Sequence, residues 1–213
     1  MERIYENPHE MWLTVTKHFL SNDITLVPSK DYRTSSVPIV SIIKHPTTKV
    51  QPNPKYSQEF ANNYVKQMCE GDSDGDFVYT YHERLFNYKG INQIDYIIDT
   101  LNKNQDSRRA IAITWQPDVD EKLEDVPCLQ NIICTLDDTG YGDVNYLNMT
   151  AVFRSHDMFL GLPMNAIGLS GLMEKIASKI DGAVIGTLTI VSLNAHVYIK
   201  RDIDDMRNFI NNY

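Results

Sequence analysis

Two neighbouring stretches, "LQNIICTLDD" (residues 129–138) and "VNYLNMTAVF" (residues 144–153), decide the fold class. Both are apolar or alternating, and turn-forming residues separate them, which is typical of paired β-strands. Shorter runs rich in β-branched residues predict strands at 36–44 and 110–115, and "AVIGTLTIVSLNAHVYI" (183–199) predicts one long strand. We therefore expect a mostly contiguous, mixed sheet.

Helical periodicity appears in the segments between these strands. The stretch "INQIDYIIDTLNKN" (91–104) places its isoleucines and leucine at helical spacing and gives the clearest signal. Further helices are expected at 7–22, 56–71, 165–180 and 201–212. The chain is long enough for one well-buried core. The prediction is a single α+β domain over residues 1–213, with a mixed β-sheet flanked by helices.

Composition narrows the classes of function. A net charge of −8 disfavours a nucleic acid polymer as partner, because such partners demand a basic face. The three cysteines lack paired spacing, which argues against a disulfide framework and against a zinc site, so we expect no metal. No apolar run is long enough to span a membrane, and the N-terminus does not resemble a signal peptide. A reducing, cytoplasmic setting is expected.

Four short motifs carry polar chemistry: "YRTSS" (32–36), "DSRRA" (106–110), "RSHDMFLGLPMN" (154–165) and "LNAHVY" (193–198). Taken singly, each has an ordinary structural explanation. The arginine pair is typical of an ion-paired surface turn, Asp157 could cap the segment after it, and His196 could be a structural histidine. Cys128, in "DVPCLQ" (125–130), could equally be a small core residue.

Taken together, the motifs have a common chemical logic. Arginines beside a serine can surround a phosphate dianion with bidentate hydrogen bonds, and this chain offers Arg33, Arg108, Arg109, Arg154 and Ser155. His196 and Tyr198 share one face of a strand and can bond a sugar hydroxyl. Asn165 offers a donor and an acceptor for the edge of a pyrimidine. Guanidinium groups near Cys128 would lower its pKa, so the thiolate could attack an electron-poor ring carbon.

The segments "DSRRAIAITWQP", "VPCLQ", "FRSHDMFLGLPMN" and "NAHVY" resemble, in order and spacing, the thymidylate synthase family, which includes the pyrimidine hydroxymethylases. The resemblance runs from about Tyr79 to Tyr198, and "YRTSS" is similar to the family's phosphate-binding turn. In length the chain resembles the short methanogen-type members. The resemblance implies a thymidylate synthase-like fold and a homodimer formed through the sheet.

The resemblance also implies a role for each matching residue. Cys128 would add to C6 of the pyrimidine, so that C5 attacks a one-carbon unit carried by a reduced pterin. Asp157 would bond the pterin, Tyr79 would lie near the reacting atoms, and Leu160 and Gly161 would line the pterin pocket. The residues that would bind the nucleotide are Arg33, Arg154 and Ser155 for the phosphate, Arg108 and Arg109 reaching across from the partner subunit, His196 and Tyr198 for the 3′-hydroxyl, and Asn165 for the base. An asparagine at this position favours dUMP over dCMP.

Departures from the family pattern leave the product and the carrier open. The family's catalytic glutamate has no clear match, since Glu59 is only a weak candidate and equally suits a solvated helix position. The family's long C-terminal extension, which excludes water, is also missing. Water could therefore complete the reaction and give a 5-hydroxymethyl product. The carrier could be 5,10-methylene-tetrahydrofolate or methylene-tetrahydromethanopterin.

Three hypotheses follow. The first is a thymidylate synthase-like methyltransferase that converts dUMP to dTMP. The second is a pyrimidine nucleotide 5-hydroxymethylase acting on dUMP or dCMP. The third is a nucleotide-binding homologue without catalysis, against which the presence of Cys128 argues because a binder needs the arginines but not the thiol.

Overall fold

A computed structural model describes residues 2–21, 26–28, 32–51, 55–71, 78–138 and 144–212, and for 26–28 it describes the backbone alone. The helices are α1 (Pro8–Leu20), α2 (Gln58–Glu70), α3 (Tyr81–Phe86), α4 (Gln93–Lys103), α5 (Pro117–Asp120), α6 (Gly161–Ala177) and α7 (Ile199–Asn212). The strands are β1 (Glu2–Tyr5), β2 (Leu26–Pro28), β3 (Tyr32–Ser35), β4 (Ile39–Ile43), β5 (Ile111–Ile113), β6 (Leu129–Asp138), β7 (Asn145–Phe153), β8 (His156–Asp157), β9 (Ala183–Ser192) and β10 (Ala195–Tyr198). The predicted α+β class is confirmed.

The strands form two sheets rather than one. Six of them make a mixed sheet in the order β1-β4-β9-β7-β6-β5, in which β1 with β4 and β7 with β9 are the parallel pairs. The other four make a second sheet in the order β2-β3-β10-β8. The expectation of one long strand over 183–199 is therefore wrong. Leu193 and Asn194 form an exposed turn between β9 and β10, and this turn is held by hydrogen bonds to the carbonyls of Phe153 and Arg154.

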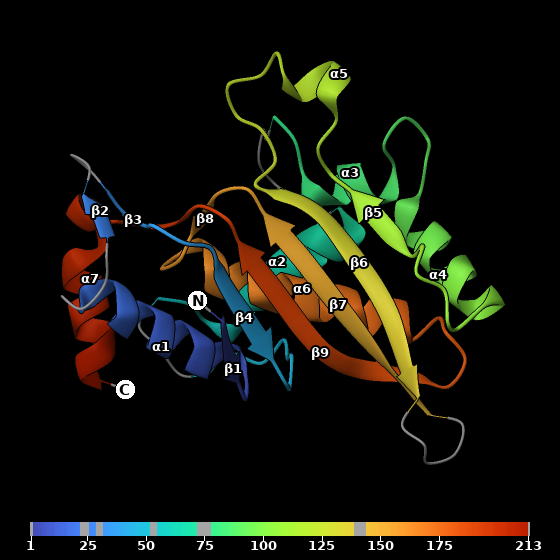
Figure 1. Cartoon of the computed structure of the whole chain (residues 1–213), viewed down its shortest axis with the longest axis horizontal. Coiled ribbons are helices and arrows are strands. Elements are labelled where there is room, and N and C mark those ends of the chain that lie inside the picture. Colours follow the sequence, from blue (N-terminus) through green and yellow to red (C-terminus); the bar gives the residue numbers. More distant parts are fainter. Residues whose placement is uncertain are drawn as a thin grey trace.

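Helix α6 is the central support of the large sheet. It crosses behind the strands together with α2, as Figure 1 shows, and most of its side chains are buried. Two glycines of α6 allow α2 to approach closely. A Cβ at Gly168 would come within 2.7 Å of Tyr64 Cε1, and one at Gly171 within 2.5 Å of Val65 Cγ1. The α2–α6 packing therefore fixes where the Tyr64 side chain lies.

The opposite face of the large sheet has no covering helix in Figure 1. We call this surface the open sheet face. Strand register sets Ile111 of β5 opposite Ile133 of β6 and, further along the sheet, Tyr146 of β7 opposite Val184 of β9. These four side chains and Ile113 are exposed in a single chain.

Two local predictions need correction. Most of the stretch "YRTSS" forms strand β3 (Tyr32–Ser35) and pairs with β10 instead of forming a turn. Tyr79 lies directly before α3, which Thr80 caps by accepting a hydrogen bond from the Glu83 amide. Helix α6 begins at Gly161, four residues before the predicted start, and its first turn includes Pro163, which a helix tolerates at that position. No helix in the described part of the chain is long and apolar enough to cross a membrane.

Candidate active site

Cys128 lies directly before β6, where the chain passes the end of β7. Its carbonyl accepts a hydrogen bond from the Arg154 amide at 2.9 Å. The Arg154 guanidinium turns back to the same loop, since Nη2 donates to the Val126 carbonyl at 2.7 Å and Nε donates to the Pro127 carbonyl at 3.0 Å. Arg154 therefore fixes the segment that presents the Cys128 thiol, which is half-buried.

The electrostatic environment of Cys128 differs from the prediction. Burial raises the pKa of the thiol and is the largest effect, while Arg154 lowers the pKa and Asp125 raises it. Only one guanidinium among the described residues acts on the sulfur, so desolvation outweighs it. The expected lowering of the Cys128 pKa is therefore wrong for a single chain.

Three tyrosines surround the segment that carries Cys128. Tyr79 forms a hydrogen bond with the backbone of Cys128, and burial raises the pKa of Tyr79 to about 12. The Tyr81 hydroxyl accepts a hydrogen bond from the Leu129 amide at 3.2 Å, and burial raises its pKa also. Burial likewise raises the pKa of Tyr64. All three hydroxyls therefore stay protonated at neutral pH, although the sequence pointed only to Tyr79.

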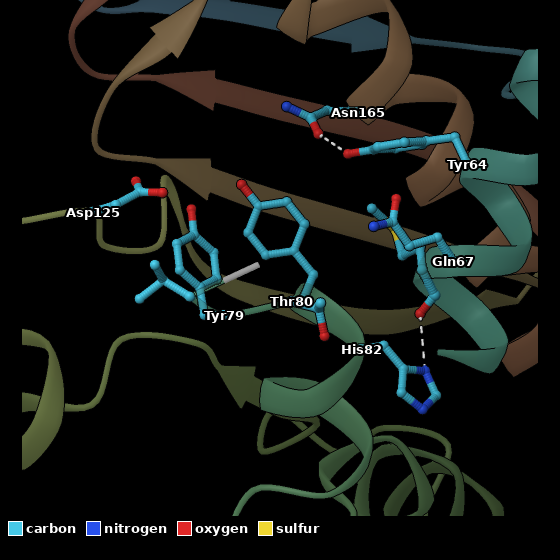
Figure 2. Close-up of a pocket in the computed structure, with 10 residues that line it drawn as sticks. Tyr64, Gln67, Tyr79, Thr80, His82, Asp125 and Asn165 are labelled. Carbon is cyan, nitrogen blue, oxygen red and sulfur yellow. Dashed lines mark hydrogen bonds between the residues drawn. The ribbon is translucent and has the colours of Figure 1, made fainter. Parts of the chain in front are cut away.

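A pocket of about 210 Å³ opens beside these tyrosines. Figure 2 shows that Tyr64, Tyr79 and Asn165 point into the same space, with Asp125 at one side. The pocket brings together α2, α6 and the loops before α3 and β6, and its lining residues are Tyr64, Gln67, Met68, Val78, Tyr79, Thr80, Tyr81, His82, Asp125 and Asn165.

Asn165 is held on both sides of its amide. It lies at the start of the second turn of α6 and is 8% exposed. The Tyr64 hydroxyl donates to Asn165 Oδ1 at 2.6 Å, and Asn165 Nδ2 lies 3.1 Å from His156 Nε2. The His156 ring stacks on Phe153 with a centroid separation of 4.0 Å. Sequence reasoning did not select His156 or Tyr64, because their partners lie on other elements.

A second group of predicted residues gathers on the small sheet. His196 and Tyr198 lie on the same side of β10, with ring centroids 5.1 Å apart. Strand pairing sets His196 opposite Asp157 of β8, whereas Arg33 of β3 pairs with Val197 and its side chain lies on the other face of the small sheet. The Arg33 guanidinium reaches the Phe19 carbonyl at 3.5 Å.

Asp157 is the last residue of β8 and lies at the end of this group nearest to α6. Its Oδ1 accepts hydrogen bonds from the amides of Phe159 and Leu160 at 3.0 and 3.1 Å, so the capping role considered for it is confirmed. Its Oδ2 pairs with Arg201 of α7, a residue that the sequence did not suggest. A Cβ at Gly161 would meet Asp157 Cβ at 3.4 Å, which leaves the space beside the carboxylate open.

Other predicted residues stand apart from the pocket. Arg108 and Arg109 are exposed in the turn between α4 and β5, and no contact of theirs with Cys128 is seen among the described residues. Ser155 lies in the short link between β7 and β8. Glu59 is exposed in the first turn of α2, in agreement with a solvated helix position. No cluster of potential metal ligands is present in the described ranges.

The comparisons with known proteins concern most of the chain. The family model described as thymidylate synthase matches residues 44–212. A relative from Methanosarcina barkeri, named "Putative thymidylate synthase", is 40% identical over 174 residues, which are 81% of this chain and 76% of the relative. The chain belongs to the thymidylate synthase family.

Other members of the thymidylate synthase family agree with this assignment. A relative of the same name from Methanocaldococcus jannaschii is 37% identical over 180 residues, which cover 80% of this chain and 78% of the relative. The solved structure of thermostable thymidylate synthase A from Bacillus subtilis shares the fold with a TM-score of 0.70 at 19% identity, covering 93% of this chain and 82% of that one. The structure of thymidylate synthase from T4 phage superposes with a TM-score of 0.64 at 18% identity, covering 94% and 80%. The thymidylate synthase fold is thus shown for nearly the whole chain.

Proposed function

We propose that this protein transfers a one-carbon unit to C5 of dUMP and forms dTMP, with Cys128 as the nucleophile. The observation that carries this proposal is the position of Cys128, whose backbone is hydrogen-bonded to Tyr79, a residue that lines the pocket together with Asn165. Family membership supports the reaction class.

The proposed chemistry uses the Cys128 thiolate first. Sγ forms a bond to C6 of the pyrimidine, and the electron pair of the C5–C6 double bond moves toward the C4 oxygen. C5 would then form a bond to the one-carbon unit and lose its proton to a base, and the bond between that unit and its carrier would break. Addition of a hydride to the one-carbon unit would re-form the C5–C6 double bond and expel Sγ. The Asn165 amide N–H suits stabilisation of the charge that develops at the C4 oxygen, while the Tyr64 hydroxyl donates to Asn165 Oδ1.

The phosphate site is proposed to combine two subunits. Arg33, Arg154 and Ser155 would hold the phosphate within one chain, and Arg108 with Arg109 would reach it from the partner. The exposure of this arginine pair supports a role outside its own chain. The open sheet face supports a homodimer, because monomeric proteins rarely leave such an apolar surface uncovered.

The one-carbon donor is proposed to lie beside Asp157, Leu160 and Gly161. The Asp157 side chain is 19% exposed and can accept hydrogen bonds from the N–H groups of a pterin, and Gly161 adds no side chain to that space. When bound, a reduced pterin supplies the one-carbon unit and, for a methyl product, the hydride. Free thiols at Cys69, Cys128 and Cys134 suit the reducing, cytoplasmic setting that we propose.

Product mass tests the proposal. The protein is incubated with dUMP, and separately with dCMP, in the presence of formaldehyde and either tetrahydrofolate or tetrahydromethanopterin. A methyl increment on dUMP is the expected result, and a hydroxymethyl increment would instead identify a hydroxymethylase. Nucleotide binding without any modification, with both carriers, would overturn the catalytic proposal in favour of a binding protein.

A further inference from the structure

A continuous chain of hydrogen bonds joins residues of β9, β8, α6 and α2, with Asn165 of α6 in its middle. Ser192 Oγ, on β9, lies 2.8 Å from His156 Nδ1, on β8. His156 Nε2 lies 3.1 Å from Asn165 Nδ2, and the Tyr64 hydroxyl of α2 lies 2.6 Å from Asn165 Oδ1. Residues from β9, β8 and α2 are therefore linked to one amide group of α6.

Burial determines the direction of the bonds on the His156 side. Ser192 is 1% exposed and His156 is 2% exposed. Burial lowers the pKa of His156 to about 3, so the ring is neutral at physiological pH and carries one N–H. An amide nitrogen can only donate, so Nε2 must accept from Asn165 and the proton of the ring must lie on Nδ1. Nδ1 then donates to Ser192 Oγ.

Tyr64 fixes the oxygen side of the same amide. Burial raises the pKa of Tyr64, so its hydroxyl keeps its hydrogen and can donate to Asn165 Oδ1. A flipped amide would set Oδ1 against His156 Nε2, two acceptors facing each other. Such a flip would require His156 to change tautomer and Tyr64 to change from donor to acceptor at the same time.

We propose that His156 and Tyr64 are positioning residues that lock the Asn165 amide in one orientation and so select a 4-oxo pyrimidine over a 4-amino pyrimidine. This inference rests on the proposed function, because it assumes that a pyrimidine edge meets Asn165. The locked amide keeps one N–H and one oxygen lone pair for the ligand. These complement O4 and N3–H of uracil, whereas cytosine would set its amino group against the N–H and its bare N3 against the oxygen.

The tautomer of His156 tests the lock in the free protein. Long-range ¹H–¹⁵N correlation spectra of ¹⁵N-histidine-labelled protein, assigned with a His156→Gln variant, should show the Nδ1–H tautomer at pH 7. The Nε2–H tautomer would mean that Asn165 presents its oxygen to His156, and that result would overturn the inference.

Nucleotide affinity tests the selection. The dissociation constants of dUMP and dCMP are measured by calorimetry for the wild type, Tyr64→Phe and His156→Gln. Glutamine at position 156 can still form a hydrogen bond with Asn165, but it can present either its oxygen or its N–H. The Asn165 amide is then no longer held in one orientation. The preference for dUMP should fall about tenfold in each variant, the worth of one good hydrogen bond, and a Tyr96→Phe control on the exposed surface should keep it.

The outcomes separate this inference from the proposed function. If both variants lose affinity for dUMP and dCMP equally, the two residues are merely structural and the inference fails while the function stands. A wild type that binds dUMP and dCMP equally also overturns the inference alone. A wild type that binds neither nucleotide overturns the proposed function, and the inference with it.

Discussion

Cys128 differs from the other two thiols of the chain in what surrounds it. Cys134 is fully buried in β6, where burial raises its pKa to about 12, and Cys69 is buried on α2, where burial raises its pKa to about 11. Cys128 is only half-buried and has Arg154 as a nearby cation. The burial of Cys69 and Cys134 therefore suits a structural role as small core residues.

Replacement of Cys128 tests covalent catalysis directly. Because Cys69 and Cys134 are buried and alanine has no nucleophilic group, Cys128→Ala should lower kcat at least about a thousandfold. Cys69→Ala is the matched control and should keep its activity. The measurement is the initial rate of product formation by mass spectrometry, and a Cys128→Ala protein with normal turnover would exclude the thiol as nucleophile.

The charge of Arg154 is expected to govern the reactivity of Cys128 with pH. The thiolate is the reacting form, and a cation stabilises it, so loss of the cation must raise the Cys128 pKa further. Arg154→Gln should therefore react more slowly with iodoacetamide at any fixed pH below the pKa, and its pH profile should move upward. Peptide mass spectrometry measures the rate at Cys128. Arg207→Gln, on the exposed side of α7, is the control, and an unchanged or downward-shifted profile in Arg154→Gln would contradict the argument.

At the scale of elements, the closeness of α2 and α6 determines the shape of the pocket. Gly168 faces the Tyr64 ring and Gly171 faces Val65, one turn further along the same helix. Tyr64 lines the pocket, whereas Val65 does not belong to its lining. Substitutions at the two glycines can therefore separate an effect on helix packing from an effect on the pocket.

Alanine at each glycine should destabilise the fold, by about 1–3 kcal/mol for overpacking. Only Gly168→Ala displaces the Tyr64 ring, so it should also weaken dUMP binding, while Gly171→Ala should keep the affinity of the wild type. Urea unfolding and calorimetry measure the two effects. Equal loss of dUMP affinity in both variants would show that α2 moves as a whole.

Sequence patterns predicted a helix or strand well where its own residues are enough to determine its structure. The strand at 129–138 was predicted residue for residue, and the helix at 91–104 was predicted to within two residues. The break at Leu193–Asn194 was missed because both flanking strands are apolar, and only their pairing with different sheets separates them. The motifs pointed to Cys128 and Asn165, but the contacts of Tyr64 and His156 arise only from tertiary packing.

At the scale of the whole molecule, the open sheet face is expected to be an interface. Ile133 lies on this face opposite Ile111 and is 38% exposed in the single chain. A charge there would have to be desolvated in a dimer, which is costly without a partner charge. Ile133→Asp should therefore sediment mainly as a monomer in analytical ultracentrifugation and lose activity. Ile91→Asp, which is exposed outside the sheet, should behave as the wild type, and a dimeric Ile133→Asp would place the interface elsewhere.

Mixing two inactive variants tests whether the site is shared between subunits. Cys128→Ala and Arg109→Ala should each be inactive, because one lacks the nucleophile and the other lacks a phosphate ligand. In a mixed dimer one site receives both intact residues, so random exchange of subunits should restore about a quarter of the wild-type activity. Product formation after mixing measures this, and mixed dimers without activity would place Arg109 in its own subunit's site.

The order of the strands also determines when this chain can fold on the ribosome. Strand β4 ends at Ile43, yet its antiparallel partner β9 begins only at Ala183. Trp12 of α1 likewise stacks on Phe209 of α7, with ring centroids 4.0 Å apart. The nascent chain must therefore carry β4 with only β1 as a strand partner, and α1 without α7, through most of translation. Arresting synthesis at successive lengths should reveal a single folding event after β9 has left the exit tunnel.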